Sequence, residues 1–233
     1  MNSCDDPEEE LVKLYRNQRH LFEQFTNAVV DCFRLEPSLN LPSKPVIHSI
    51  KTRLKDPNHL KQKLLRKKSS QPTELITKEN FFARVTDLSG VRILHLYQDQ
   101  FDKINAFIQA KVNNGDWTFA EKPKAYSWDP EAVAFFSSFG LDVELKESFY
   151  TSIHYLVKPK AAADVCCEIQ IRTLFEEIWG EIDHTINYPV PTKASACKEQ
   201  LRVLSRLVST GTRLADSIFR SHSEHSGVDP TPK

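Results

Sequence analysis

The stretch from Cys166 to His184 reads C-C-E-I-Q-I-R-T-L-F-E-E-I-W-G-E-I-D-H, and the rest of the chain is organised around it. Apolar and polar residues alternate in its first half, which predicts a β-strand with a period of two. Its polar side carries Glu168, Gln170 and Arg172, about 7 Å apart at roughly 3.3 Å of rise per residue. A row of carboxylate, amide and guanidinium suits a metal and a phosphate chain better than plain solvent. After Thr173, a residue type that suits a helix N-cap, the spacing becomes helical.

The composition is that of an ordinary globular protein, with 233 residues of which 40% are hydrophobic and 27% charged. The formal net charge is zero, so the chain lacks the global attraction that many nucleic-acid binders use, although a local basic patch remains compatible with it. Five cysteines without a metal-binding spacing predict reduced thiols and a cytoplasmic protein. We expect no signal peptide and no membrane partner, because the N-terminus is acidic and no apolar run approaches a membrane span.

Upstream, apolar residues at three- and four-residue steps predict a long amphipathic helix over residues 8–35, followed by a proline-rich connector. Residues 46–68 are strongly basic, and Asp56-Pro57 predicts the start of a helix within them. Arg53 and Lys55 stand just before that helix and Lys63 projects from it. Such a charge run is usually a solvated face. The sharper interpretation is a polyphosphate-binding wall, since a helix N-terminus with converging cations is a natural anion site.

Three further strands are predicted between this basic segment and the starting stretch. Residues 91–97 form one, with Asp87 in the turn that enters it and Gly90 allowing close backbone approach. A helix over residues 100–112 follows, and then an irregular aromatic region with a short helix near 130–136 and a short strand over 141–145. Residues 150–157 alternate again, so that Tyr150 and His154 share one face of a strand with Ser152. Taken alone, each of these polar residues is more often a packing or turn residue than a ligand.

The last predicted helix covers residues 193–220. Its apolar residues gather on one side, and a basic stripe follows the other. The members of that stripe are Lys198, Arg202, Arg206, Arg213 and Arg220. The stripe is either a solvated face or a docking surface for an acidic partner or an RNA backbone. We therefore divide the chain into an N-terminal helix with connector (1–45), a core (46–190), a C-terminal helix packing on the core (191–220) and a disordered tail (221–233).

Four of these segments, in this order and spacing, resemble the alarmone synthetase domain of the RelA/SpoT family. They are Arg53-Leu54-Lys55 with Lys63, Asp87-Leu88-Ser89-Gly90-Val91-Arg92, Tyr150-Thr151-Ser152-Ile153-His154, and Glu168-Ile169-Gln170-Ile171-Arg172-Thr173 with His184 and Tyr188. The resemblance covers about residues 46–190. It implies an α/β (α+β) fold with a mixed, nucleotidyltransferase-like sheet flanked by helices, to which this chain adds long terminal helices. It also implies transfer of the β,γ-pyrophosphate of ATP to a ribose 3′-hydroxyl.

The family resemblance gives the candidate residues their roles. Asp87 and Glu168 would hold one Mg²⁺, and Glu168 would also take the proton of the acceptor hydroxyl. The ATP-binding residues would be Arg53, Lys55, Lys63 and Arg92, of which Arg92 would stack on the adenine or contact phosphate. The acceptor-binding residues would be Tyr150, His154, Gln170 and Arg172, with Tyr150 stacking on a guanine.

The chain departs from the family pattern at two places. Phe149 stands where the family usually has glycine, and His59 stands where many members have serine. The first departure leaves the acceptor less certain than the donor, and three hypotheses remain. The protein makes guanosine tetra- or pentaphosphate from ATP and GDP or GTP, or it modifies the 3′ end of tRNA as a toxin with an antitoxin partner, or it is a silent nucleotide-binding module. The intact acids Asp87 and Glu168 speak against the third. Small family members are often homo-oligomers, so self-association is a further expectation.

Overall fold

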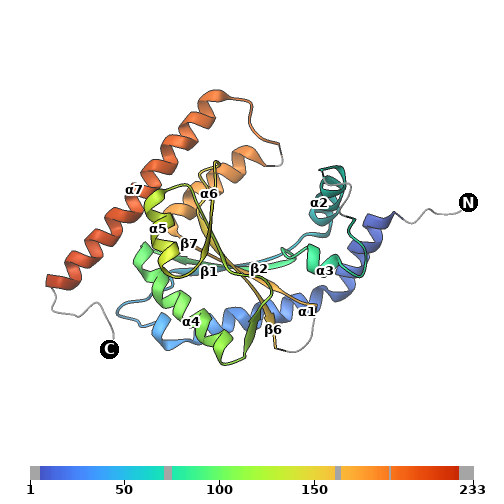
Figure 1. Ribbon diagram of the computed structural model, residues 1–233, viewed down its shortest axis with the longest axis horizontal. Helices are drawn as coiled ribbons and strands as arrows, with labels where there is room; N and C mark the ends of the chain where they lie inside the picture. The colour runs from blue at the N-terminus through green and yellow to red at the C-terminus, as the bar shows by residue number, and fades with distance from the viewer. Residues whose placement is uncertain (1–5, 71–74, 161–163, 189, 226–233) are drawn as a thin grey trace, which may run out of the picture.

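The computed structural model describes residues 6–70, 75–160, 164–188 and 190–225 (Figure 1). The helices are α1 (Pro7–Leu35), η1 (Pro37–Leu39), α2 (Pro57–Ser70), α3 (Phe81–Arg84), η2 (Gln98–Gln100), α4 (Phe101–Asn113), α5 (Pro130–Ser138), α6 (Leu174–Asn187) and α7 (Ser195–His225). The strands are β1 (Ser49–Leu54), β2 (Ser89–His95), β3 (Trp117–Phe119), β4 (Lys124–Ser127), β5 (Asp142–Leu145), β6 (Ser152–Pro159) and β7 (Cys167–Thr173). The predicted mixed sheet flanked by helices, with long helices at both ends, is confirmed.

The strands form one seven-stranded sheet in the order β1-β2-β7-β6-β4-β5, with β3 paired to β6. The central pair β2 and β7 is parallel, and β1 and β6 flank it in antiparallel register. Gly90 faces Glu168 across the parallel pair, and a Cβ atom at Gly90 would lie only 3.3 Å from the Glu168 carbonyl oxygen. Glycine at this position therefore permits the close approach of the two strands that carry the polar rows.

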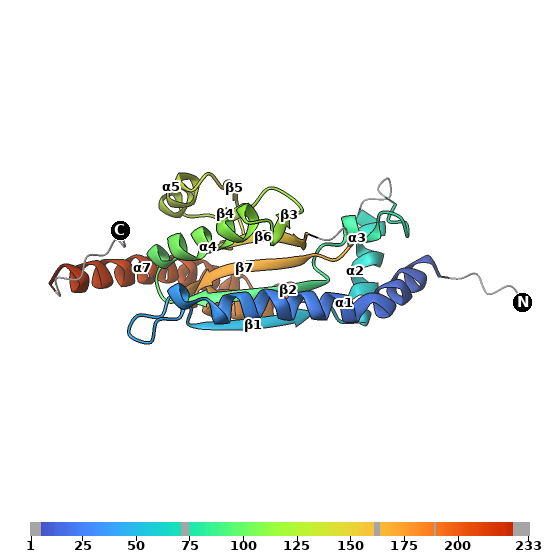
Figure 2. The ribbon, with the colours of Figure 1, turned by 90° about the horizontal axis from the view of Figure 1, so that it is seen from below.

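Helices α1 and α4 cover one face of the sheet, while α6 and α2 lie on the other side (Figures 1 and 2). The covered face carries the apolar alternation of each strand, including Ile93, Ile171 and Tyr155, which are fully or almost fully buried. Phe33 of α1 and Phe107 of α4 pack into the same core. Because successive strand residues point to opposite faces, burying this row leaves the polar row on the side of α6 and α2.

The turn from β7 into α6 is fixed by a capping box. Thr173 Oγ1 accepts a hydrogen bond from the Glu176 amide at 3.2 Å, and Glu176 Oε2 accepts one from the Thr173 amide at 2.7 Å. This reciprocal pair satisfies backbone donors that a helix start leaves open. It confirms the predicted cap and makes the starting stretch a strand that runs directly into a helix.

Several predicted elements differ from the structure. The basic segment contains strand β1, which the charged residues at alternate positions concealed, and the region expected to be irregular contains β3 and β4. The last helix continues to His225, past its predicted end at residue 220. The predicted tail thus begins as helix, and residues 226–233 of it lie outside the described residues.

The apolar side of the last helix is only partly covered. Leu207, Leu214 and Ile218 are 64%, 59% and 57% exposed, whereas Ser205, Thr212 and Asp216 are buried. Helix α7 therefore turns its small and polar side toward α5 and α6, and the cavity between them has both charged and aromatic side chains in its lining. Among the described residues, no helix combines the length and the apolar character that crossing a bilayer requires.

Candidate active site

The face of the sheet opposite α1 and α4 brings together residues from four adjacent strands, β1, β2, β7 and β6. The strand register places Arg53 beside Gly90 and Glu168 in one row, and it places Lys51, Arg92, Gln170 and His154 in the next. The candidates that belong to the strands therefore share one surface, and four further candidates come from outside the strands. These four are Lys55 just after β1, Lys63 of α2, Asp87 in the turn before β2 and Tyr150 just before β6.

Glu168 stands at the centre of this surface. Its carboxylate contacts His154 Nδ1 at 3.0 Å and accepts a hydrogen bond from Gln170 Nε2 at 2.8 Å. Burial alone would raise the pKa of Glu168, but His154 and then Gln170 outweigh it, so the pKa lies below its ordinary value. The carboxylate is consequently ionised at neutral pH and oriented by two neighbours, as a metal ligand or proton acceptor requires.

Asp87 is held by two lysines of the basic segment. Lys63 Nζ lies 2.6 Å and Lys55 Nζ 2.9 Å from its carboxylate oxygens. Burial works to raise the pKa of Asp87, yet the hydrogen bonds and charges of Lys63 and Lys55 bring it below the ordinary value. The charge of Asp87 in turn acts to raise the pKa of Glu168. The two acids are therefore close enough for the charge of one to act on the pKa of the other.

The N-terminal helix fixes the backbone on both sides of this contact. Tyr15 of α1 is fully buried, and its hydroxyl lies 2.9 Å from the Lys55 carbonyl oxygen and 3.2 Å from that of Leu88. Asp56 caps α2 by accepting hydrogen bonds from the amides of Asn58 and His59. The lysine side chains and Asp87 are thus set by neighbouring backbone groups, and Lys55 itself is buried at 8% exposure.

The predicted acceptor residues form a second cluster on the β6 side. Tyr150 Oη lies 3.0 Å from His154 Nε2 and also accepts a hydrogen bond from Arg172 Nη2. The guanidinium of Arg172 lies over the Tyr150 ring at 4.7 Å, and its Nε donates to Ser152 Oγ at 3.1 Å. His154 therefore links Tyr150 to Glu168 and connects the acceptor cluster with the central carboxylate.

The two departures from the family pattern are both visible in the structure. Phe149 has φ +63°, in the left-handed region that favours glycine, and its ring packs edge-on against Trp128 at 5.4 Å. His59 lies beside Tyr188, with ring centroids 6.3 Å apart, and Tyr188 stacks on His184 at 4.7 Å. The start of α2 and the end of α6 thus meet through aromatic rings at the edge of the site.

Glu177 is a site residue to which sequence reasoning gave no role. It is 5% exposed, and its carboxylate accepts from Lys51 Nζ at 2.8 Å and from Arg92 Nη1 at 2.8 and 3.0 Å. Arg172 Nη1 lies 3.4 Å away. One carboxylate therefore joins cations of the expected ATP and acceptor groups. Its signal in the sequence was an acid in the first turn of a helix, which is ordinarily explained by the helix dipole.

The arginine candidates differ in what holds them. Arg92 also pairs with Glu181 at 2.8 Å, so both of its carboxylate partners, Glu177 and Glu181, belong to α6. Arg53 is exposed on β1. In the predicted basic stripe, Arg213 pairs with Asp129 and Arg220 pairs with Asp99. These two arginines belong to the packing of α7 rather than to one continuous cationic surface.

The donor set can be tested for a metal. Within the described residues, no group of three or more histidine, cysteine or acidic side chains is arranged to hold an ion. Two carboxylates suffice for Mg²⁺, which usually keeps waters and takes its other ligands from substrate phosphates. Asp87 and Glu168 fit that requirement if Lys55 and Lys63 release Asp87 to the ion and turn to the phosphates.

Comparison with solved structures finds the same fold. The small alarmone synthetase 1 from Bacillus subtilis superposes with a TM-score of 0.66 at 20% identity, covering 91% of this chain and 97% of that one. The same protein bound to its product pppGpp gives 0.62 at 20% identity, with coverages of 91% and 96%. Bound to AMPCPP it gives 0.61 at 17% identity, with coverages of 91% and 99%. The comparison with curated proteins gave no match.

A family model supplies the remaining evidence. The model described as the region found in RelA/SpoT proteins matches residues 52–193, which is more than half of the chain and contains nearly every site residue described above. The match begins inside β1 and ends after α6, so it includes the central strands and both clusters of polar side chains. The chain therefore belongs to the RelA/SpoT family and is a pyrophosphotransferase of that family.

Proposed function

We propose that this protein transfers the β,γ-pyrophosphate of ATP to the 3′-hydroxyl of GDP or GTP. The observation that supports the proposal is that Lys55 and Lys63 hold the Asp87 carboxylate, while the Glu168 carboxylate on the neighbouring strand pair contacts His154 of a Tyr-His-Arg cluster. The similar Bacillus subtilis protein has been solved with AMPCPP and with pppGpp, which supports ATP as the donor and a guanine nucleotide as the acceptor.

On the donor side, Lys55 and Lys63 bind phosphate oxygens. They already converge within hydrogen-bond distance of one point, the Asp87 carboxylate. When the triphosphate enters, its negative charge replaces that of Asp87 as their partner. Arg53 and Arg92 add charge from β1 and β2. Fixed cations of this kind stabilise the charge that shifts toward the departing AMP.

On the acceptor side, the Tyr150 ring stacks on the base while Arg172 holds Tyr150 in place from behind. Glu168 lies next to His154 in this cluster and takes the proton of the 3′-hydroxyl as that oxygen attacks the β-phosphorus. Gln170 and His154 keep the carboxylate oriented and ionised for this step. Mg²⁺ held by Asp87 and Glu168 would neutralise the phosphate oxygens and so lower the barrier to the departure of AMP.

The test is a transfer assay with γ-labelled ATP and Mg²⁺ in the presence of GDP, GTP or bulk tRNA. We expect label in pppGpp or ppGpp. Label in tRNA would replace the acceptor with an RNA end, and no label in any of them would support a silent binding module. Glu168→Gln should abolish transfer, while the exposed Glu147→Gln serves as its matched control. Full activity of Glu168→Gln would refute the role of this carboxylate.

A further inference from the structure

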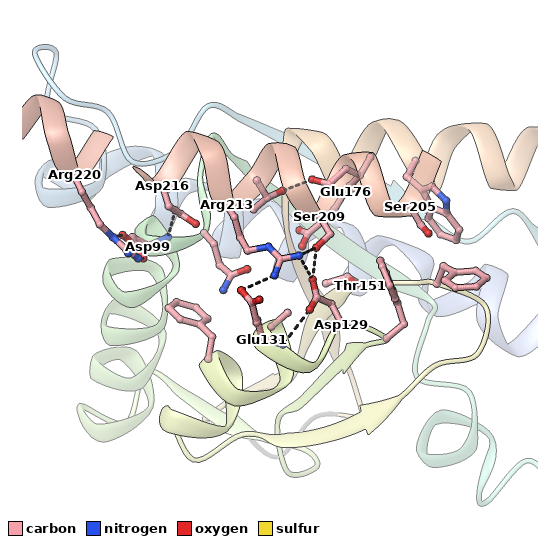
Figure 3. Close-up of a pocket in the computed structure, with 18 residues that line it drawn as sticks. Asp99, Asp129, Glu131, Thr151, Glu176, Ser205, Ser209, Arg213, Asp216 and Arg220 are labelled. Atoms are coloured by element: carbon pink, nitrogen blue, oxygen red, sulfur yellow. Dashed lines mark hydrogen bonds and ion pairs between the residues drawn. The ribbon is translucent and has the colours of Figure 1, made fainter. Parts of the chain in front are cut away.

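A cavity of about 300 Å³ lies between η2, α5, α6 and α7 (Figure 3). Thr151 and Glu176 line it, whereas their neighbours Ser152 and Glu177 belong to the active-site surface. None of the residues proposed for transfer lines this cavity. Its volume is at the lower end of the range of small-molecule sites, about 300 to 1,000 Å³.

The polar lining is dominated by acids. Five carboxyl side chains and two arginines contribute to it, namely Asp99, Asp129, Glu131, Glu176 and Asp216 with Arg213 and Arg220. Figure 3 shows both arginines reaching from α7 to acids on the opposite wall. Arg220 binds Asp99 through two nitrogens at 2.6 and 2.7 Å, and Arg213 binds Asp129 at 3.0 Å and Glu131 at 2.5 Å. Three acids therefore neutralise the arginines, and two acids remain.

The two remaining acids, Glu176 and Asp216, are held by backbone amides rather than by arginines. Glu176 Oε2 accepts from the Thr173 amide at 2.7 Å, and Asp216 Oδ1 accepts from the Asp99 amide at 3.0 Å. Asp216 is only 6% exposed. Burial raises the pKa of Asp216 to about 6 and that of Glu176 to about 7. Ionisation of both is thus disfavoured in the free protein, and a cation between them would offset the cost.

The apolar part of the lining is aromatic. Trp128 and Phe149 pack edge to face at 5.4 Å, and Phe135 and Trp179 add further ring surface. Aromatic faces attract organic cations, and this attraction strengthens where water is excluded. The same carboxylates oppose phosphates and nucleotides, so an anionic ligand is the wrong chemistry for this cavity. We propose that the cavity binds a small organic cation, with its amine between Glu176 and Asp216 and its apolar body against the aromatic wall.

The cavity and the active site are also connected by consecutive residues of the chain. Phe149 lines the cavity and directly precedes Tyr150, whose hydroxyl contacts His154 and Arg172. Phe149 holds a left-handed backbone conformation, which is costly for a residue with a side chain. A ligand that contacts the Phe149 ring therefore acts on the backbone that places Tyr150.

Calorimetric titration of the full chain tests this site without any nucleotide, so its outcome is independent of the proposed transfer reaction. Benzylamine is the probe at pH 8, with benzyl alcohol as its neutral analogue and benzoate as its anionic one. We expect saturable binding of one benzylamine per chain and none of the other two. Lowering the pH to 5 should weaken binding, because Glu176 and Asp216 then take up protons.

Two variants decide whether the cavity acids hold the amine. Asp216→Asn and Glu176→Gln keep the backbone hydrogen bonds, and each should weaken benzylamine binding about tenfold, as expected for one charge-assisted hydrogen bond. The exposed Glu199→Gln on the same helix is the matched control. Urea unfolding of each variant verifies that it is folded. Equal affinity for benzyl alcohol, unchanged affinity in both variants, or no benzylamine binding would overturn the proposal.

Discussion

Replacing Glu177 with glutamine removes one buried negative charge while keeping the shape of the side chain. The carboxylate faces three cations at 2.8 to 3.4 Å, but these contacts are not equal in value. Lys51 is 54% exposed, so its contribution is largely screened. Arg172 is 6% exposed and Arg92 25%, so they lose a partner that water replaces poorly. We expect Glu177→Gln to lower the free energy of unfolding by about 2 to 4 kcal/mol.

The assay combines urea unfolding with transfer kinetics, and Glu181→Gln is the matched control. Glu181 contacts the same Arg92 nitrogen at 2.8 Å from the same helix, but it is 56% exposed. Its replacement should cost no more than about 0.5 kcal/mol. Because Arg172 supports Tyr150, Glu177→Gln should also raise the KM of the acceptor more than that of ATP. If the two variants were equally stable, burial would not be the source of the effect and the reasoning would be refuted.

Three other expectations concern single side chains. Lys63→Met should raise the KM of ATP about tenfold because one of the two lysines proposed to bind phosphate is lost, whereas Lys67→Met should leave it unchanged in the same kinetic assay. Thr173→Ala should lower the unfolding free energy in urea by about 1 kcal/mol through loss of the capping box, and a loss below the error of the measurement would contradict it. Asp216 has its pKa raised to about 6 in the folded protein from 3.8, so the folded state keeps a proton between these values and stability falls as pH rises through them. Asp216→Asn should therefore be about 2 to 3 kcal/mol more stable than the parent in urea at pH 8 and no different at pH 4. Equal stability of the two proteins at pH 8 would show that ionised Asp216 does not destabilise the fold.

The strands that alternate cleanly could be predicted from the sequence. Residues 167–173 and 152–159 bury one row on the sheet and leave the other polar, so their period gives both the strand and the face. Strand β1 could not be found this way, because one face carries lysine and arginine and the opposite face of the strand is only partly buried. The contact side of the last helix could not be found from the pattern either. Leu207, Leu214 and Ile218 of its apolar side are exposed, and a periodic pattern does not show which side meets the rest of the protein.

The candidate site was predictable only as a set of residues. Asp87 and Glu168 lie 81 positions apart, and no local pattern indicates that a parallel strand pair brings their charges together. The family motifs supplied that information. Glu177 escaped both approaches, because an acid early in a helix is common and its meaning depends on the two arginines and the lysine that fold around it.

The hydroxyl of Tyr15 connects the first helix to the proposed phosphate-binding site. This single group contacts the backbone of the segment that carries Lys55 and the backbone of the segment that carries Asp87. The spacing between this cation and this acid therefore depends on whether α1 stays in place. A partner protein that displaced α1 would move Lys55 away from Asp87. It would thereby stop transfer without occupying the binding site of either nucleotide.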